Sequence, residues 1–143
     1  MAFNTISHGM MLETIGSEAS LPDFGGTALV LDGLLGYSLA GAPRGRTAQL
    51  IAAANNSRVP MLALDVPSGL SADTGVPFEP TTRARRTLTL ALPKVGLLQP
   101  SAQTYVGELF VADISVPPRL YERFGLSVGS LFSTEDVVRV DLS

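Results

Sequence analysis

The sequence predicts an α/β fold built on a mostly parallel sheet of about four or five strands. Two nearly continuous apolar runs, residues 27–31 and 59–64, lack the alternation of a half-exposed strand, which is typical of parallel strands covered on both faces. A helix-favouring stretch lies between them. Strand, helix and strand in this order form a βαβ unit, whose crossover is almost always right-handed.

The helix of this unit is expected at residues 45–54. Ala, Gln and Leu dominate the stretch, and Leu50, Ile51 and Ala54 share one face. Residues 55–57, which are Asn-Asn-Ser, are expected to end it.

The remaining chain predicts two more strands and a short helix. Pro and Gly are frequent in residues 66–80, which indicates an irregular loop. A third strand is expected at 87–92, where Thr alternates with Leu and one face is less deeply buried. A fourth is expected at 108–112, followed by a proline-opened helix at 117–124.

Both ends of the chain carry helical patterns. Ser133 followed by Glu135 and Asp136 predicts the start of a last helix, because acidic residues in a first turn favour the helix dipole. Residues 5–17 predict a helix that uses Ile6 and Met10 among its apolar positions.

Length and composition indicate one domain. The chain of 143 residues is divided into an N-terminal segment, residues 1–26, and a domain over residues 27–143. With 45% hydrophobic and 16% charged residues, it is not an extended disordered chain. No apolar run approaches the about 18 residues of a membrane span, and the amino terminus lacks a secretory pattern, so no membrane association and a cytoplasmic location are expected.

Several classes of chemistry are excluded. The absence of cysteine rules out disulfides, thiolate zinc sites and a cysteine nucleophile. With His8 as the only histidine, there is also no Ser-His-Asp triad with a plausible partner. The net charge of −3 comes without a basic stripe, so no nucleic-acid partner is expected. The local cluster of Arg83, Arg85 and Arg86 is interpreted as a solvated approach to a strand.

Two predicted strands are followed by an aspartate. Asp32 precedes a loop with three glycines, and Asp65 precedes Ser68 in a Val-Pro-Ser-Gly turn. In open parallel sheets ligands bind beyond the carboxyl ends of the strands. Two carboxylates, a hydroxyl and free carbonyls are hard oxygen ligands, suited to an alkali or alkaline-earth cation. The alternative is that each aspartate only caps the turn that follows it.

Four ordered stretches resemble one known family. They lie at residues 32–36 (DGLLG), 64–75 (LDVPSGLSADTG), 91–97 (ALPKVGL) and 111–118 (VADISVPP). Over residues 27–120 the chain is similar to the carboxyl-terminal half of the YjeF amino-terminal domain, the NAD(P)H-hydrate epimerase family. The resemblance implies a Rossmann-like, three-layer αβα fold.

The same resemblance implies a repair activity and a set of site residues. The activity is the interconversion of the R and S forms of hydrated NADH or NADPH. Asp32 and Ser68 fall on positions that bind a potassium ion, and Asp65 falls on a position that contacts the nucleotide. Asp65 is our acid/base candidate, because inversion at the hydrated carbon needs a group that gives and takes a proton. The remaining nucleotide contacts implied are Gly36, Tyr37, Ser38, Leu39, Ala40, Gly41 and Ala42.

The sequence also departs from the family pattern. The family's Gly-Asn-Asn-Gly-Gly-Asp-Gly loop has no counterpart here, and Asn55-Asn56 is a helix end. The expected partner is therefore another copy of the chain or a second chain that completes the sheet. A truncated product, half of a split enzyme and a repurposed module all fit this pattern. A dimerising scaffold without catalysis, as in relatives in RNA-decapping assemblies, and a nucleotide-binding module are alternative functions.

One short segment and two further polar residues receive local interpretations. Asp73, Thr74 and Gly75 are expected to form a turn, and Asp113 is expected to cap one. Lys94 is interpreted as a solvated lysine, with contact to a phosphate as the alternative.

Overall fold

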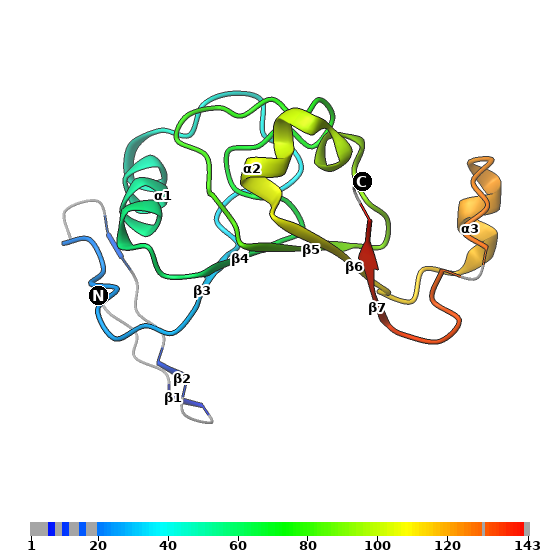
Figure 1. Cartoon of the computed structure of the whole chain (residues 1–143), viewed down its shortest axis with the longest axis horizontal. Helices are drawn as coiled ribbons and strands as arrows, with labels where there is room; N and C mark the ends of the chain where they lie inside the picture. Colours follow the sequence, from blue (N-terminus) through cyan, green and yellow to red (C-terminus); the bar gives the residue numbers. More distant parts are fainter. Residues whose placement is uncertain (1–5, 8–9, 12–14, 17–19, 130, 142–143) are drawn as a thin grey trace.

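The protein is built around one five-stranded sheet (Figure 1). The computed structural model describes residues 6–7, 10–11, 15–16, 20–129 and 131–141. The strand order is β3-β4-β5-β6-β7, with parallel pairing from β3 to β6 and antiparallel pairing of β7. The α/β class and the mostly parallel sheet are confirmed. The strands are β3 (Val30–Asp32), β4 (Met61–Leu64), β5 (Arg86–Leu90), β6 (Glu108–Ala112) and β7 (Val137–Val140).

The helices are α1 (Gly45–Ser57), α2 (Gln103–Val106) and α3 (Pro118–Arg123), with 3-10 turns η1 (Val95–Leu98) and η2 (Pro100–Ala102) before α2. Figure 1 shows α1 and α2 on the same side of the sheet and α3 beyond its β6–β7 end. In the described part of the chain no helix covers the opposite side, so it forms two of the three layers that the resemblance implies. None of the described helices is long and apolar enough to cross a membrane.

The side of the sheet under α1 and α2 is the buried one. Ala63, Thr87, Thr89, Leu109 and Val111 point to this side and are at most 1% exposed. The two threonines lie here because their hydroxyls find acceptors: Thr87 Oγ1 donates to the Val106 carbonyl at 2.8 Å, and Thr89 Oγ1 bonds to a carboxylate described below. The Thr-Leu alternation of β5 therefore buries its polar residues more deeply than its leucines, since hydrogen bonds offset the cost of burial.

The opposite side of the sheet is apolar and only partly covered. Leu31 is 61% exposed and Leu64 is 40% exposed. We call this side the open face, and its main residues are Leu31, Leu62, Leu64, Leu88, Leu90 and Phe110. The open face continues to the outer edge of β3, which is an edge strand of the sheet among the described residues. Contiguous apolar surface and a free strand edge are features that proteins normally cover.

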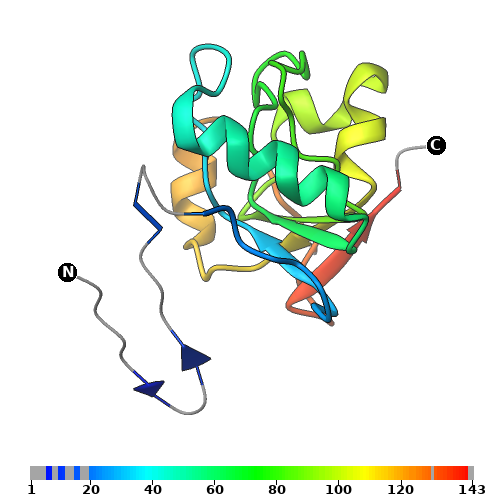
Figure 2. The same cartoon turned by 90° about the vertical axis from the view of Figure 1, so that its left-hand side faces the viewer.

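Two of the expected helices are wrong. The described residues of 5–17 include no helix: β1 (Ile6–Ser7) pairs antiparallel with β2 (Met10–Met11), and Figure 2 shows these short strands apart from the main sheet. Residues 5, 8–9, 12–14 and 17 lie outside the described residues. Gly9 and Gly16 in the sequence disfavour a helix over this stretch.

The expected helix after Ser133 is also replaced by a strand. Residues 137–140 are Val-Val-Arg-Val, and they pair with β6 in the register Val111↔Val138 and Leu109↔Val140. β-Branched valines fit a pleated surface, and this preference outweighs the acidic residues that suggested a helix start.

Other boundaries move by a few residues. The first strand of the sheet begins at Val30 rather than residue 27, and the predicted strand at 108–112 is observed with those bounds. Helix α1 continues through Ser57 and ends at Arg58, which adopts the left-handed conformation common at helix C-termini (φ 60°).

A charge cluster closes the amino end of β5 and β6. Arg86 Nε bonds to Glu108 Oε2 at 2.7 Å, and Arg139 Nη2 lies 3.4 Å from Glu108 Oε1. The hydrogen bond from Arg86 lowers the pKa of Glu108 below its ordinary value, with the charges of Arg86, Arg139 and Arg85 acting in the same direction. The arginine cluster is thus partly paired rather than simply solvated.

We predict that Arg86→Met raises the pKa of Glu108 toward its ordinary value, as measured by carboxyl ¹³C NMR during an acid titration. A lowered folded-state pKa means that Glu108 stabilises the fold above its unfolded pKa and that this contribution is lost as the pH falls through the folded pKa. Arg119→Met, on exposed α3, is the control and leaves the titration unchanged. An unchanged Glu108 titration in Arg86→Met would contradict the assigned cause.

Candidate functional site

The two strand-end aspartates leave the same edge of the sheet. Asp32 is the last residue of β3, and Asp65 directly follows the last residue of β4. Because β3 and β4 are parallel and Asp32 is in register with Ala63, Asp65 lies two positions beyond it along the neighbouring strand. The carboxyl edge of the sheet therefore holds both carboxylates, as the sequence predicts.

Asp32 and Ser68 form a buried pair. Asp32 is 4% exposed and Ser68 is 1% exposed. Ser68 donates twice, from its backbone N–H to Asp32 Oδ2 at 2.8 Å and from Oγ to Asp32 Oδ1 at 2.7 Å. Ser68 Oγ in turn accepts the N–H of Leu35 at 2.9 Å. The pair ties the end of β3, and the loop that follows it, to the loop after β4.

The turn that carries Ser68 requires glycine at the next position. Gly69 has φ +97°, and a Cβ there would lie 2.6 Å from the Pro80 carbonyl oxygen and 2.8 Å from the Thr81 Cα. The Leu70 N–H closes the turn on the Pro67 carbonyl at 2.9 Å. The Pro-Ser-Gly sequence thus fixes the Ser68 side chain against Asp32.

Asp65 faces the end of β5 rather than its own turn. Its Oδ1 accepts the N–H of Leu90 at 3.1 Å and the hydroxyl of Thr89 at 3.2 Å, and Lys94 Nζ bonds to the same oxygen. The Asp65 and Lys94 side chains are 24% and 18% exposed. The turn-cap interpretation fails for Asp65, whereas Asp32 makes one such contact, with the Leu34 N–H at 3.3 Å.

Lys94 was singled out from the sequence, but its contact with Asp65 was not predicted. The solvated-lysine interpretation is wrong, because Nζ donates to the Leu90 carbonyl at 3.0 Å and to Thr89 Oγ1 at 3.1 Å, besides Asp65. The available signal was its place two residues after the third predicted strand, at the edge where Asp32 and Asp65 emerge. A lone lysine after a strand is too common a feature to indicate a buried contact.

Two of the motif stretches pack backbone against backbone. The Gly96 N–H donates to the Ala72 carbonyl at 2.7 Å, and a Cβ at Gly96 would lie 2.3 Å from the Ser71 carbonyl oxygen. The expected turn is present, with the Gly75 N–H on the Ser71 carbonyl at 2.9 Å. This contact places the segment that begins at Lys94 against the loop that begins at Asp65.

The loop from Gly36 to Ala42 leaves the same edge and leads to α1. Most of it is exposed, and Tyr37 is 58% exposed. The Tyr37 hydroxyl donates to Asp73 Oδ1 at 3.2 Å, which connects the loop to the Ser71–Gly75 turn. The structure thus brings this loop, Asp32, Ser68 and Asp65 to one edge of the sheet.

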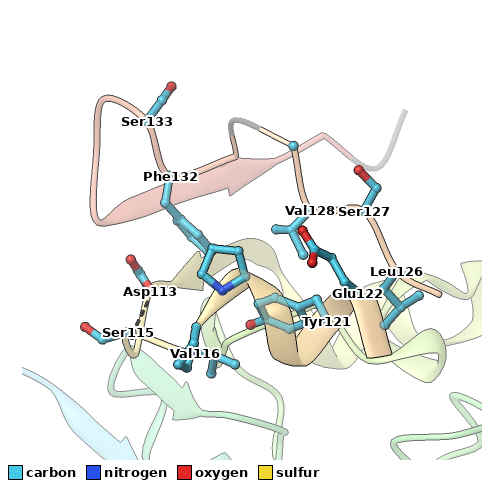
Figure 3. A pocket seen from close by; sticks show the side chains of 13 residues that line it. Asp113, Ser115, Val116, Tyr121, Glu122, Leu126, Ser127, Val128, Phe132 and Ser133 are labelled. Carbon is cyan, nitrogen blue, oxygen red and sulfur yellow. Dashed lines mark hydrogen bonds between the residues drawn. The ribbon is translucent and has the colours of Figure 1, made fainter. Parts of the chain in front are cut away.

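A separate cavity lies beside α3 at the end of β6. Its volume is about 660 Å³, and Asp113, Tyr121 and Phe132 are among its lining residues (Figure 3). Asp113 Oδ1 accepts the Ser115 N–H at 2.7 Å, which bears out its expected role as a turn cap. β6 is three strands from β3, about 14 Å away, so this cavity is distinct from the Asp32–Ser68 pair.

Comparison with known proteins identifies the family. The family model described as "YjeF-related protein N-terminus" matches residues 5–96. The chain belongs to this family. The matched range begins before β3 and covers Asp32, Ser68, Asp65 and Lys94.

Curated relatives carry repair-enzyme names. A protein of Dehalogenimonas lykanthroporepellens named NAD(P)H-hydrate epimerase is 47% identical over 105 residues, which are 73% of this chain and 41% of the relative. An epimerase of the same name from Rhodopirellula baltica is 39% identical over 118 residues, 82% of this chain and 48% of the relative. The chain spans less than half the length of these two relatives.

One solved structure has a similar fold. The crystal structure of yeast ynu0, YNL200c, superimposes with a TM-score of 0.63 at 18% identity, covering 80% of this chain and 47% of the yeast chain. At this identity the likeness supports the fold alone.

We predict that Ser68→Ala lowers the free energy of unfolding by about 1–3 kcal/mol, because it removes the hydroxyl that donates to Asp32 and accepts from Leu35 inside the protein. Urea unfolding monitored by circular dichroism measures the loss. Ser127→Ala, at an exposed position, is the matched control and changes stability by less than about 0.5 kcal/mol. Equal stabilities of the two variants would show that the pair contributes nothing.

Proposed function

We propose that this chain supplies the carboxyl-terminal part of an NAD(P)H-hydrate epimerase, which interconverts the R and S forms of hydrated NADH and NADPH. The observation that carries the proposal is the arrangement at one sheet edge, where Asp32 bonds to Ser68 and Asp65 bonds to Lys94. The epimerase names of the two bacterial relatives support it. The proposal keeps the cytoplasmic location expected from the sequence.

Asp65 is the proposed acid and base. Epimerisation inverts the carbon that carries the added hydroxyl, so a bond at that carbon has to break and form again. Removal of the hydroxyl proton lets the carbon–nitrogen bond of the ring open to an aldehyde, with a proton taken up by the ring nitrogen. Addition of that nitrogen to the other face of the aldehyde closes the ring and returns a proton to the oxygen. A carboxylate can remove and return the hydroxyl proton in one site, provided that it is held within hydrogen-bond reach of the hydroxyl. The partial exposure of Asp65 at the sheet edge and its hydrogen bonds to β5 support this role.

The loop from Gly36 to Ala42 is the proposed nucleotide contact. Its glycines allow the backbone to approach a ligand closely, and it begins four residues after Asp32. The loop is mostly exposed and is connected to the rest of the edge through Tyr37. It would hold the nucleotide while Asp65 faces the hydrated ring.

Asp32 and Ser68 are the proposed potassium ligands. Carboxylate and hydroxyl oxygens, with the Leu35 carbonyl 3.3 Å from Ser68 Oγ, form a hard oxygen donor set that fits such an ion. The three hydrogen-bond donors described for Asp32 are neutral, so a cation would compensate its buried charge. The described residues hold no cluster of three acidic or histidine side chains, so backbone carbonyls, water or another segment would complete the shell.

The proposed partner is a second polypeptide that supplies the remaining part of the family domain. Such a partner would add a strand at the outer edge of β3 and cover the open face. The exposed leucines of the open face, and the outer edge of β3, with which no described strand pairs, support a partner at this place. The exposed leucines at positions 31 and 64 lie where this partner would bind.

The activity is tested with the chain alone and mixed with a polypeptide matching the part of the Dehalogenimonas epimerase outside the aligned region. Chromatography follows the conversion of one form of hydrated NADH into the other, against a sample without protein. We predict conversion in the mixture and a loss of about 10²–10⁴-fold in Asp65→Asn. Asp113→Asn, which keeps the local turn, is the matched control and retains activity.

No conversion by folded chain in any pairing would overturn the epimerase proposal. Equal activity of Asp65→Asn and Asp113→Asn would remove Asp65 from the reaction while leaving the activity in place.

A dimerising scaffold is the second candidate, and the open face favours it. Leu31→Glu introduces a charge into that face, and we predict that it abolishes self-association if two copies pair there. Light scattering over a dilution series measures the mass, with Arg119→Glu on α3 as the control. A chain that is monomeric at every concentration contradicts the scaffold and favours the heteromeric partner.

A further inference from the structure

Lys94 has a side chain whose hydrogen-bonding capacity is fully used. It is the only lysine in the sequence and lies between β5 and η1. An ammonium group carries three N–H donors, and Nζ bonds to three oxygens: Asp65 Oδ1, Thr89 Oγ1 at 3.1 Å and the Leu90 carbonyl at 3.0 Å. Binding a phosphate would require the loss of at least one of these contacts in a partly buried site. The geometry thus disfavours the phosphate alternative.

Asp65 is held through one of its two oxygens. Oδ1 accepts the Lys94 ammonium, the Thr89 hydroxyl and the Leu90 N–H. Among the residues that the structure describes, no hydrogen-bond donor to Oδ2 is found. The Asp65 backbone has φ 68°, a left-handed conformation that is uncommon outside glycine and persists where surrounding contacts fix it. The carboxylate is therefore oriented by Oδ1, while Oδ2 stays available at the edge of the sheet.

We propose that Lys94 is a positioning residue for the epimerase reaction, and that Asp65 Oδ2 is the atom that exchanges a proton with the substrate hydroxyl. Lys94 acts through Asp65 and does not touch the substrate. Its ammonium and the β5 backbone fix the carboxylate plane, so that the free oxygen faces the ligand in one orientation. This inference rests on the proposed function, since it assigns a role within that reaction.

The contact itself is tested in the chain alone. Protein labelled with ¹⁵N-lysine has a single side-chain ammonium, so its signal needs no assignment. We predict that this signal shifts in Asp65→Ala, and that the Leu90 amide exchanges at least about tenfold faster in Lys94→Met than in Lys94→Arg, which can still donate. If Asp65→Ala does not fold, the exchange rate of the Leu90 amide in the two Lys94 variants tests the contact instead. An unchanged ammonium signal in folded Asp65→Ala, or equal Leu90 exchange in the two Lys94 variants, overturns the contact.

The role is tested in the active assembly of chain and partner. We predict that Lys94→Met lowers kcat by about ten- to a hundredfold with KM within about twofold, and that Lys94→Arg recovers part of kcat. Arg119→Met is the matched control, because it exchanges an exposed cation for the same residue outside the family match. A raised KM with unchanged kcat would assign Lys94 to substrate binding and overturn the positioning role.

Failure of the proposed function is a separate result. If wild-type chain shows no conversion with any partner while the Lys94 and Leu90 signals behave as predicted, the contact stands and the epimerase role falls. If conversion occurs and Lys94→Met matches the wild type, the epimerase stands and the positioning role falls.

Discussion

The buried hydrogen bonds between Asp32 and Ser68 hold the candidate site together. They join the end of β3 to the loop after β4. The two strands themselves pair over only three residues of each strand. The Asp32 carboxylate is 4% exposed, and a buried carboxylate without hydrogen-bond donors costs free energy. The Ser68 N–H and hydroxyl are therefore held in position to donate to it. The left-handed Gly69 and the close approach of Pro80 follow from this requirement. The position of Asp65, three residues before Ser68, is set by the same short segment.

The two faces of the sheet differ in their side chains, with buried threonines on one face and exposed leucines on the other. Under α1 and α2, Thr87 and Thr89 are fully buried with their hydroxyls bonded, and Thr89 links the core to Asp65 and Lys94. The open face instead presents leucines, and it ends at the outer edge of β3, with which no described strand pairs. The face under α1 and α2 is thus a well-packed core that supports the polar site. The open face instead resembles a protein–protein interface.

The strands β3 and β4 and the position of the two aspartates could be predicted from the sequence, because local and tertiary preferences agree in these segments. Apolar runs without alternation predicted β3 and β4, and the aspartates that end them are at one edge because parallel strands end together. β7 was missed because Glu135 and Asp136 resemble a helix start, whereas pairing of the valines with β6 decides the outcome. The contacts of Lys94 were not predicted, because they lie on residues brought near by β5 and the following turn, and no spacing in the sequence encodes that geometry.

The most direct measurement is a crystal structure of the active assembly with hydrated NADH bound. We expect the added hydroxyl to lie within hydrogen-bond distance of Asp65 Oδ2, with Lys94 still bonded to Oδ1 and the nucleotide along the loop from Gly36 to Ala42. A ring seated in the cavity beside α3, or a hydroxyl facing away from Asp65 with Lys94 on the phosphates, would contradict it.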